Sequence, residues 1–323
     1  MDLESMKHYG ITKEFDKADY FETQHYQTML TNIQHAIKAG GLLALTGMVG
    51  TGKTVTLRRI QQTMRDNNKI IVCKSLATDR RQVNINTLYT ALFADLATKK
   101  DGKMPTQPEK RERKLQSLIR DLNKAVVLFI DEAHDLHPRT LIGLKHLIET
   151  VQDGQGTLAI AVIGHPKLAN DLRNPALEEI GARARIFELG SMGTQSPKFI
   201  EWLLKNCSKN TIKPYDILTK EAVALLSDRL ITPLQMTYYL TRALEKGYEI
   251  GEKPVSAGTI QKILSPDLNM LEPNLARHGY NFVVLCEKLN IKRQEIKAYL
   301  RGQLNPSRLE EINNEIHKLG VLL

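Results

Sequence analysis

The chain has 323 residues, of which 42% are hydrophobic and 25% are charged, a composition typical of a soluble globular protein with two or three domains. Its longest apolar runs are too short to cross a bilayer, its N-terminus is acidic where a signal peptide is basic, and its three cysteines, Cys73, Cys207 and Cys286, lie far apart. We therefore expect a cytoplasmic protein without disulfides, zinc clusters or membrane contact. The formal net charge of +9 favours a polyanionic partner, such as nucleic acid or a headgroup surface.

Helical and strand patterns alternate along the first 192 residues. Met29, Ile33 and Ile37 recur at helical spacing, and two glycines end that helix at residues 40 and 41. Apolar runs predict strands at 42–46, 69–73, 126–130, 158–163 and 186–189. Between them, helices are expected at 55–64, 87–97, 109–122 and 139–151. This order predicts an α/β fold with a parallel sheet covered by helices on both faces.

A glycine-rich segment lies between the first predicted strand and the helix that follows it. The pattern G-x-x-x-x-G-K-[ST] is formed by Gly47, Met48, Val49, Gly50, Thr51, Gly52, Lys53 and Thr54. Glycines let the backbone N–H groups of such a loop curl around phosphates, and the helix N-terminus adds partial positive charge. Lys53 would reach the β- and γ-phosphates, and Thr54 would place its hydroxyl on Mg²⁺. The sequence therefore predicts that this segment binds ATP.

Basic residues cluster between the second and third predicted strands. Arg80 and Arg81 come just past the second strand, and Lys99, Lys100 and Lys103 begin a longer basic run. Such a run is either a solvated face or a surface that contacts DNA phosphates without reading bases. The sequence leaves both interpretations open, and we take these five side chains as candidate DNA contacts.

The third predicted strand ends in two acidic residues. Asp131 and Glu132 follow the apolar run 126–130, and ligands gather at the carboxyl ends of parallel strands. We expect Asp131 to hold Mg²⁺ beside the nucleotide and Glu132 to polarise the attacking water. The string from Asp131 to His134 also spells the DEAH box of one helicase superfamily, but no matching set of helicase motifs follows.

Only helical patterns follow residue 192. Helices are expected at 196–205, 220–230, 233–246 and 256–264, and prolines at 266 and 273 predict a linker. In the last stretch, Asn290 separates two apolar helical faces, and asparagine tolerates the left-handed conformation of a tight turn. Two such faces at this separation have the spacing of a helix-turn-helix. Four cations of the second helix, Lys292, Arg293, Lys297 and Arg301, would then face DNA phosphates. The alternative is a helical module that docks a protein or caps an oligomer.

With these motifs in order, residues from about 20 to 250 resemble the AAA+ ATPases typified by TnsC, TniB and the B protein of phage Mu. Those proteins choose target DNA for a partner transposase. The stretch is also similar to the ATPase half of ExeA, a secretion protein, and the Walker motifs do not separate these subfamilies. The resemblance implies an AAA+ nucleotide-binding domain at 1–192, a helical lid at 193–268 and a small helix-turn-helix-like unit at 274–323.

The resemblance also implies roles for further residues. The segment 162–168 resembles the one that ends in sensor 1, which implies that His165 lies near the γ-phosphate. The run before the last strand implies that Arg183 or Arg185 is the arginine finger of a neighbouring subunit's site. At the start of the sensor 2 helix many relatives have an arginine, whereas this chain has Gln235, so a cis-acting sensor 2 charge is not expected.

These features together predict an ATPase that requires Mg²⁺ and assembles as a ring or filament on duplex DNA, where it recruits or regulates a transposase. One alternative is an ExeA-like secretion or envelope-assembly ATPase. Another is a replication accessory of the helicase-loader type.

Overall fold

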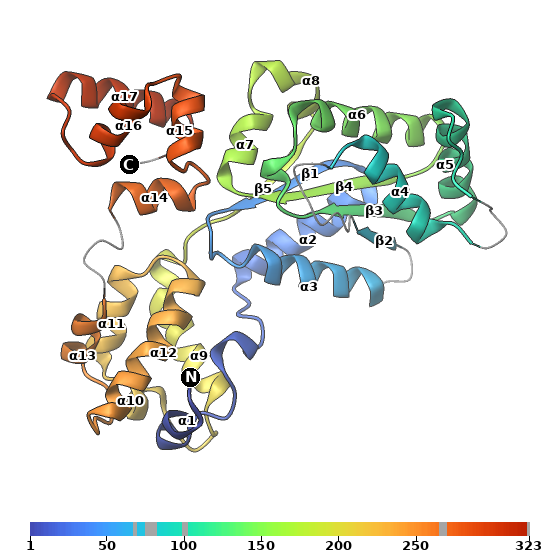
Figure 1. The fold of residues 1–323 in the computed structure, drawn as a ribbon. Coiled ribbons are helices and arrows are strands. Elements are labelled where there is room, and N and C mark those ends of the chain that lie inside the picture. The colour runs from blue at the N-terminus through green and yellow to red at the C-terminus, as the bar shows by residue number, and fades with distance from the viewer. Residues whose placement is uncertain (67–69, 75–82, 99–102, 265–269, 322–323) are drawn as a thin grey trace.

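The computed structural model describes the whole chain except residues 67–69, 75–82, 99–102, 265–269 and 322–323 (Figure 1). Four of the candidate DNA contacts, Arg80, Arg81, Lys99 and Lys100, therefore lie outside the described residues. Among the residues that are described, every helix is too short or too polar to cross a membrane.

Five parallel strands form one sheet, in the order β2-β3-β4-β1-β5. Their bounds are β1 Gly41–Gly47, β2 Ile70–Lys74, β3 Ala125–Ile130, β4 Leu158–Gly164 and β5 Arg185–Leu189. The register places Thr46 of β1 opposite Gly164 of β4, so neighbouring strands end at the same edge of the sheet. The predicted α/β fold with a parallel sheet is confirmed.

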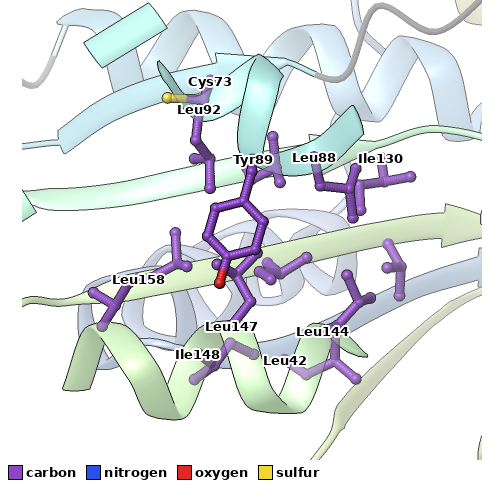
Figure 2. Packing of buried hydrophobic residues seen from close by; sticks show 14 of the residues in the cluster. Leu42, Cys73, Leu88, Tyr89, Leu92, Ile130, Leu144, Leu147, Ile148 and Leu158 are labelled. Carbon is purple, nitrogen blue, oxygen red and sulfur yellow. The ribbon is translucent and has the colours of Figure 1, made fainter. Parts of the chain in front are cut away.

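Helices cover both faces of the sheet because side chains along each strand alternate between two cores. Leu43 and Leu45 of β1 pack in the core under α2 and α3, whereas Leu42 and Ala44 pack in the other core. The first face carries α2 Gln24–Ala39 and α3 Lys53–Asp66. The second carries α4 Ile85–Leu96, α5 Pro108–Leu122, α6 Pro138–Asp153, α7 Pro166–Leu172 and α8 Glu178–Gly181. On that face Tyr89 of α4 points toward Leu147 of α6 (Figure 2).

A separate helical core follows the sheet. It is built by α9 Ser196–Cys207, α10 Pro214–Ile217, α11 Lys220–Arg229, α12 Pro233–Glu249 and α13 Ala257–Ile263. The N-terminal elements α1 Leu3–Tyr9 and η1 Phe15–Lys17 share this core through Tyr9, Ile11 and Phe15. The hydroxyl of Tyr9 donates a hydrogen bond to the carbonyl oxygen of Glu252 at 2.6 Å. The first residues, which the sequence grouped with 1–192, thus pack with α9–α13 instead of with the sheet. These helices lie in the region 193–268 that was predicted to be a helical lid, and we keep that name for them.

The C-terminal unit, residues 271–321, has a hydrophobic core of its own. Its helices are α14 Leu271–Arg277, α15 Phe282–Leu289, α16 Arg293–Leu300 and α17 Pro306–Lys318. Asn290 joins α15 to α16 in the left-handed conformation, with φ 52° and ψ 40°, as predicted. Pro273 was predicted to lie in a linker, which is wrong because it stands in the first turn of α14. Proline is tolerated there because an N–H in the first turn has no acceptor within the helix.

Candidate nucleotide site

The glycine-rich loop connects β1 to α3. Gly50 and Gly52 have φ angles of +87° and +93°, a region that favours glycine. A side chain at Gly50 would also collide with the helical lid, because its Cβ would lie 2.8 Å from both the Thr232 hydroxyl and the Leu234 Cβ. At Gly52 a Cβ would meet nothing within 4 Å. The loop therefore packs against the lid at Gly50. At Gly52 there is open space beside the backbone, which a phosphate group needs in order to approach it.

Lys53 is the first residue of α3, and its side chain is buried. Its Nζ donates hydrogen bonds to the carbonyl oxygens of Gly47 and Met48, at 2.8 and 3.0 Å. Burial lowers the pKa of Lys53, while the carboxylates of Glu132 and Asp131 act in the opposite direction. These electrostatic interactions mean that the loop and the acidic residues predicted to work with it share one site.

Asp131 and Glu132 stand where β3 ends. A carboxylate oxygen of Asp131 accepts a hydrogen bond from the backbone N–H of Glu132 at 2.9 Å. Glu132 has φ 55° and ψ 36°, in the left-handed region that residues other than glycine rarely adopt. Such conformations concentrate at functional sites, where the surrounding structure holds them. The conformation turns the chain out of the sheet and into the short helix η3 Ala133–Asp135, which carries His134.

His134 and His165 stack directly beside Glu132. Their ring centroids are 3.8 Å apart and their planes differ by 19°. Burial lowers the pKa of both imidazoles, that of His165 to about 3, so both rings are neutral at neutral pH. The structure thus brings the predicted sensor residue His165 next to the predicted catalytic base. His134 was not predicted to take part, although its place in the DEAH string marked it. We call Gly47–Thr54, Asp131, Glu132, His134 and His165 the nucleotide edge.

The two arginine-finger candidates differ in their surroundings. Arg183 pairs with Glu149, with 3.0 Å between Nη1 and Oε1, on the exposed surface beside α6. Arg185 is the first residue of β5, is exposed, and forms no ion pair that involves the described part of the chain. Arg185 is therefore the candidate that is better able to reach a second molecule.

The side chain of Gln235 caps the start of its own helix. Its carboxamide oxygen accepts hydrogen bonds from the backbone N–H groups of Ile231 and Thr232, at 3.0 and 3.2 Å. Together with the Thr232 hydroxyl, this forms a capping box at the start of α12. The expectation that this position carries no sensor charge agrees with its role as a helix cap.

The C-terminal unit docks on the nucleotide edge (Figure 1). The backbone N–H of Val49 in the phosphate loop donates to the carbonyl oxygen of Arg277, at 3.0 Å. Gly279, with φ +91°, approaches His165 so closely that a Cβ would lie 3.0 Å from the histidine Cβ. The helix after His165 adds contacts, because the Asn170 amide donates to the Tyr280 hydroxyl at 3.0 Å. The sequence did not predict this docking.

Several exposed cations lie apart from the nucleotide edge. Lys103 is exposed, and so are Arg293 and Lys297 of α16 and the residues at its two ends, Lys292 and Arg301, which together we call the α16 cations. A cavity of about 340 Å³ lies beside β2 and is lined by Arg58, Gln61, Gln62, Arg65, Asp66 and Lys74. The sequence did not indicate this site, because its three basic side chains come from two elements, α3 and β2, and do not form a continuous run.

Residues 34–172 match the family model of the AAA domain. General secretion pathway protein A of Aeromonas hydrophila is 27% identical over 172 residues, which make up 51% of this chain and 29% of that protein. The chain therefore spans less than a third of the length of this relative.

Similar solved structures extend over almost the whole chain. Cdc6p from Pyrobaculum aerophilum is 14% identical with a TM-score of 0.58, covering 96% of this chain and 91% of its own. The Aeropyrum pernix ORC2 protein, in its ADP form, is 14% identical with a TM-score of 0.55, and the match covers 97% of this chain and 100% of the ORC2 chain. The Thermotoga maritima RuvB branch migration motor is 16% identical with a TM-score of 0.50, and the match covers 98% of this chain and 93% of the RuvB chain. The chain has the fold of the P-loop AAA+ NTPases.

Proposed function

We propose that this chain binds and hydrolyses ATP at the nucleotide edge. The observation that carries the proposal is the convergence of Lys53 with Asp131 and Glu132 at the ends of β1 and β3. Lys53 already donates to two loop carbonyls, so its ammonium lies where a bound phosphate would compete for it. The ADP form of the Aeropyrum pernix protein, which shares the fold, agrees with this assignment.

Each residue then has one task. The N–H groups of Gly50–Thr54 bind phosphate oxygens, and Lys53 adds a positive charge at the β- and γ-phosphates. Thr54 and Asp131 provide oxygen ligands suited to Mg²⁺, which when bound neutralises charge on the phosphates. Glu132 accepts a proton from the attacking water, and His165 contacts the γ-phosphate as a neutral imidazole.

An assembly of subunits completes the site. Arg185, or Arg183 after release from Glu149, reaches the nucleotide of a neighbouring subunit and stabilises the charge that develops during hydrolysis. Activity therefore depends on a ring or filament.

The assembly forms on duplex DNA and recruits or regulates a transposase. The net charge of +9, the exposed cations of α16 and the basic cavity beside β2 support a sequence-independent contact with phosphates. The structure of Drosophila ORC bound to DNA, 14% identical with a TM-score of 0.52, provides a DNA-bound example of the fold.

A second candidate function is that of a secretion ATPase. It is favoured by the similarity to General secretion pathway protein A, which covers 51% of this chain. A helicase-loader-type replication accessory is a third candidate, and it shares the DNA contact with the leading proposal.

Fluorescence anisotropy with labelled duplex DNA tests the leading proposal. We expect binding that requires ATP or a non-hydrolysable analogue, shows little sequence preference and weakens steeply with salt, because neutralised phosphates release counterions. Electron microscopy of the same mixture should show rings or filaments, and a partner transposase should be retained on them. Affinity that is equal with and without nucleotide, or flat with salt, contradicts the DNA proposal and favours the secretion candidate.

A further inference from the structure

Three metal-binding side chains meet where β3 and β4 end. Oε2 of Glu132 lies 3.5 Å from Nδ1 of His134 and 3.9 Å from Nε2 of His165. One ligand atom from each of the three residues lies within 4.8 Å of the other two. Two imidazoles and one carboxylate thus lie close together, and because the two rings are stacked and nearly parallel, one ring must turn before both can bind the same ion.

These donors match zinc and not magnesium. Zn²⁺ binds nitrogen and oxygen at about 2.0–2.2 Å in tetrahedral geometry, which places neighbouring ligand atoms about 3.3 Å apart. The separations of 3.5 and 3.9 Å from Glu132 to the two histidines are slightly longer than that value, and metal binding therefore requires that one of the stacked rings turns out of the stack toward the carboxylate. Mg²⁺ prefers oxygen ligands and octahedral geometry, so two imidazoles would not select it.

The surroundings of His134 favour a metal further. Its Nδ1, the atom that faces Glu132, is buried and makes no hydrogen bond within the part of the chain that the structure describes. Its Nε2 lies 4.0 Å from a carboxylate oxygen of Asp135. This distance is too long for a hydrogen bond, and only if Asp135 moves closer can its carboxylate accept one and orient the histidine, as carboxylates do behind metal-bound histidines.

We propose that Glu132, His134 and His165 form a binding site for a divalent transition metal, preferentially Zn²⁺, with a fourth position open to water. The bound ion coordinates the carboxylate of Glu132, which can then no longer accept a proton from the attacking water. Zinc therefore inhibits ATP hydrolysis. This inhibition rests on the proposed ATPase function, whereas the binding of zinc does not.

Cobalt(II) titrated into the full, nucleotide-free chain provides an optical test, because cobalt in a four-coordinate nitrogen and oxygen site absorbs strongly in the visible range. We expect saturation near one equivalent and displacement of cobalt by zinc. His134→Ala and His165→Ala should each weaken cobalt binding by more than about tenfold, since even the loss of an outer-shell partner costs roughly 10–100-fold.

Two control variants locate the site. His146→Ala removes an exposed histidine of α6 and should leave the cobalt spectrum unchanged. Thr54→Ala should also leave it unchanged, which separates this site from the one assigned to Mg²⁺. Circular dichroism of every variant checks that the fold is kept, and Glu132→Gln weakens binding with the least change of shape.

A wild-type protein without the four-coordinate spectrum overturns the proposal. So does binding that survives both His134→Ala and His165→Ala. Zinc binding by a protein that shows no ATPase activity supports the metal site and counts against the proposed function alone.

Discussion

The nucleotide edge and the C-terminal unit touch each other but are built on different principles. The edge consists of short segments at the ends of buried strands, so the hydrogen-bonded sheet fixes its residues in place. The C-terminal unit has its own core and reaches the edge through a few polar contacts, including those of Val49 and Asn170. Changes in the edge should therefore alter chemistry, whereas changes at the contact should alter only how firmly the unit is docked.

The largest expected effect belongs to Glu132→Gln. Removing the carboxylate while keeping the shape should lower phosphate release by about 10²–10⁴-fold, the usual contribution of a general base, with nucleotide binding retained. Phosphate release and nucleotide affinity are measured on the same preparation, and Glu178→Gln, an exposed residue of α8, is the control. Hydrolysis at the wild-type rate would refute the assignment of Glu132.

Lys53→Ala should act on binding itself. Charge-assisted hydrogen bonds contribute about 1.5–3 kcal/mol each, so we expect nucleotide affinity to fall by at least about tenfold to a hundredfold. Titration with a fluorescent ATP analogue measures the change, and Lys124→Ala, which removes an exposed lysine, should have no effect. Unchanged affinity would mean that the loop does not hold phosphates.

Replacing the α16 cations tests the other side of the comparison. Arg293→Ala should reduce the slope of log affinity for DNA against log salt by about one, and replacing Lys292, Arg293, Lys297 and Arg301 together by up to about four. Nucleotide affinity should stay the same, because these side chains are exposed and belong to the C-terminal unit, which has its own core. Lys209→Ala serves as a control on the helical lid. A slope that does not change would assign α16 to protein docking or to capping an oligomer.

Asn170→Ala should have the smallest effect. It removes the bonds from its amide to the Tyr280 hydroxyl and the Leu319 carbonyl, and should weaken docking of the C-terminal unit by about 1–3 kcal/mol. Limited proteolysis should then release the unit faster, while global thermal unfolding changes little. The exposed Asn86→Ala is the matched control. Equal proteolysis rates in the two variants would show that Asn170 does not hold the unit in place.

The sequence predicted the two strands that lead into Gly47–Thr54 and Asp131, because this information is local. An apolar run followed by Gly47–Thr54 is both a strand end and a chemical motif, and the strand at 126–130 places Asp131 by the same logic. The turn at Asn290 was predicted for a similar reason, since few residues tolerate the left-handed conformation.

The features that escaped prediction depend on tertiary contacts. Pro273 is compatible with either a linker or a first helical turn, and only the packing of Leu275 in the C-terminal core decides between them. The stacking of His134 on His165 requires β3 and β4 to be neighbours, although a helix separates them in sequence. The docking of Gly279 on His165 has no local sequence pattern at all.

The phosphate loop is held by backbone hydrogen bonds from two later parts of the chain. Val49 donates to Arg277, and Leu234 donates to Gly50 at 3.2 Å. During synthesis the loop leaves the ribosome long before either partner, and contacts between residues far apart in sequence form slowly. The nascent chain can therefore form the sheet and the loop at its edge early, whereas the two hydrogen bonds that tie the loop to the helical lid and to the C-terminal unit form only after those parts have been made. The contacts that join the three parts of the molecule should accordingly be among the last that a newly made chain acquires.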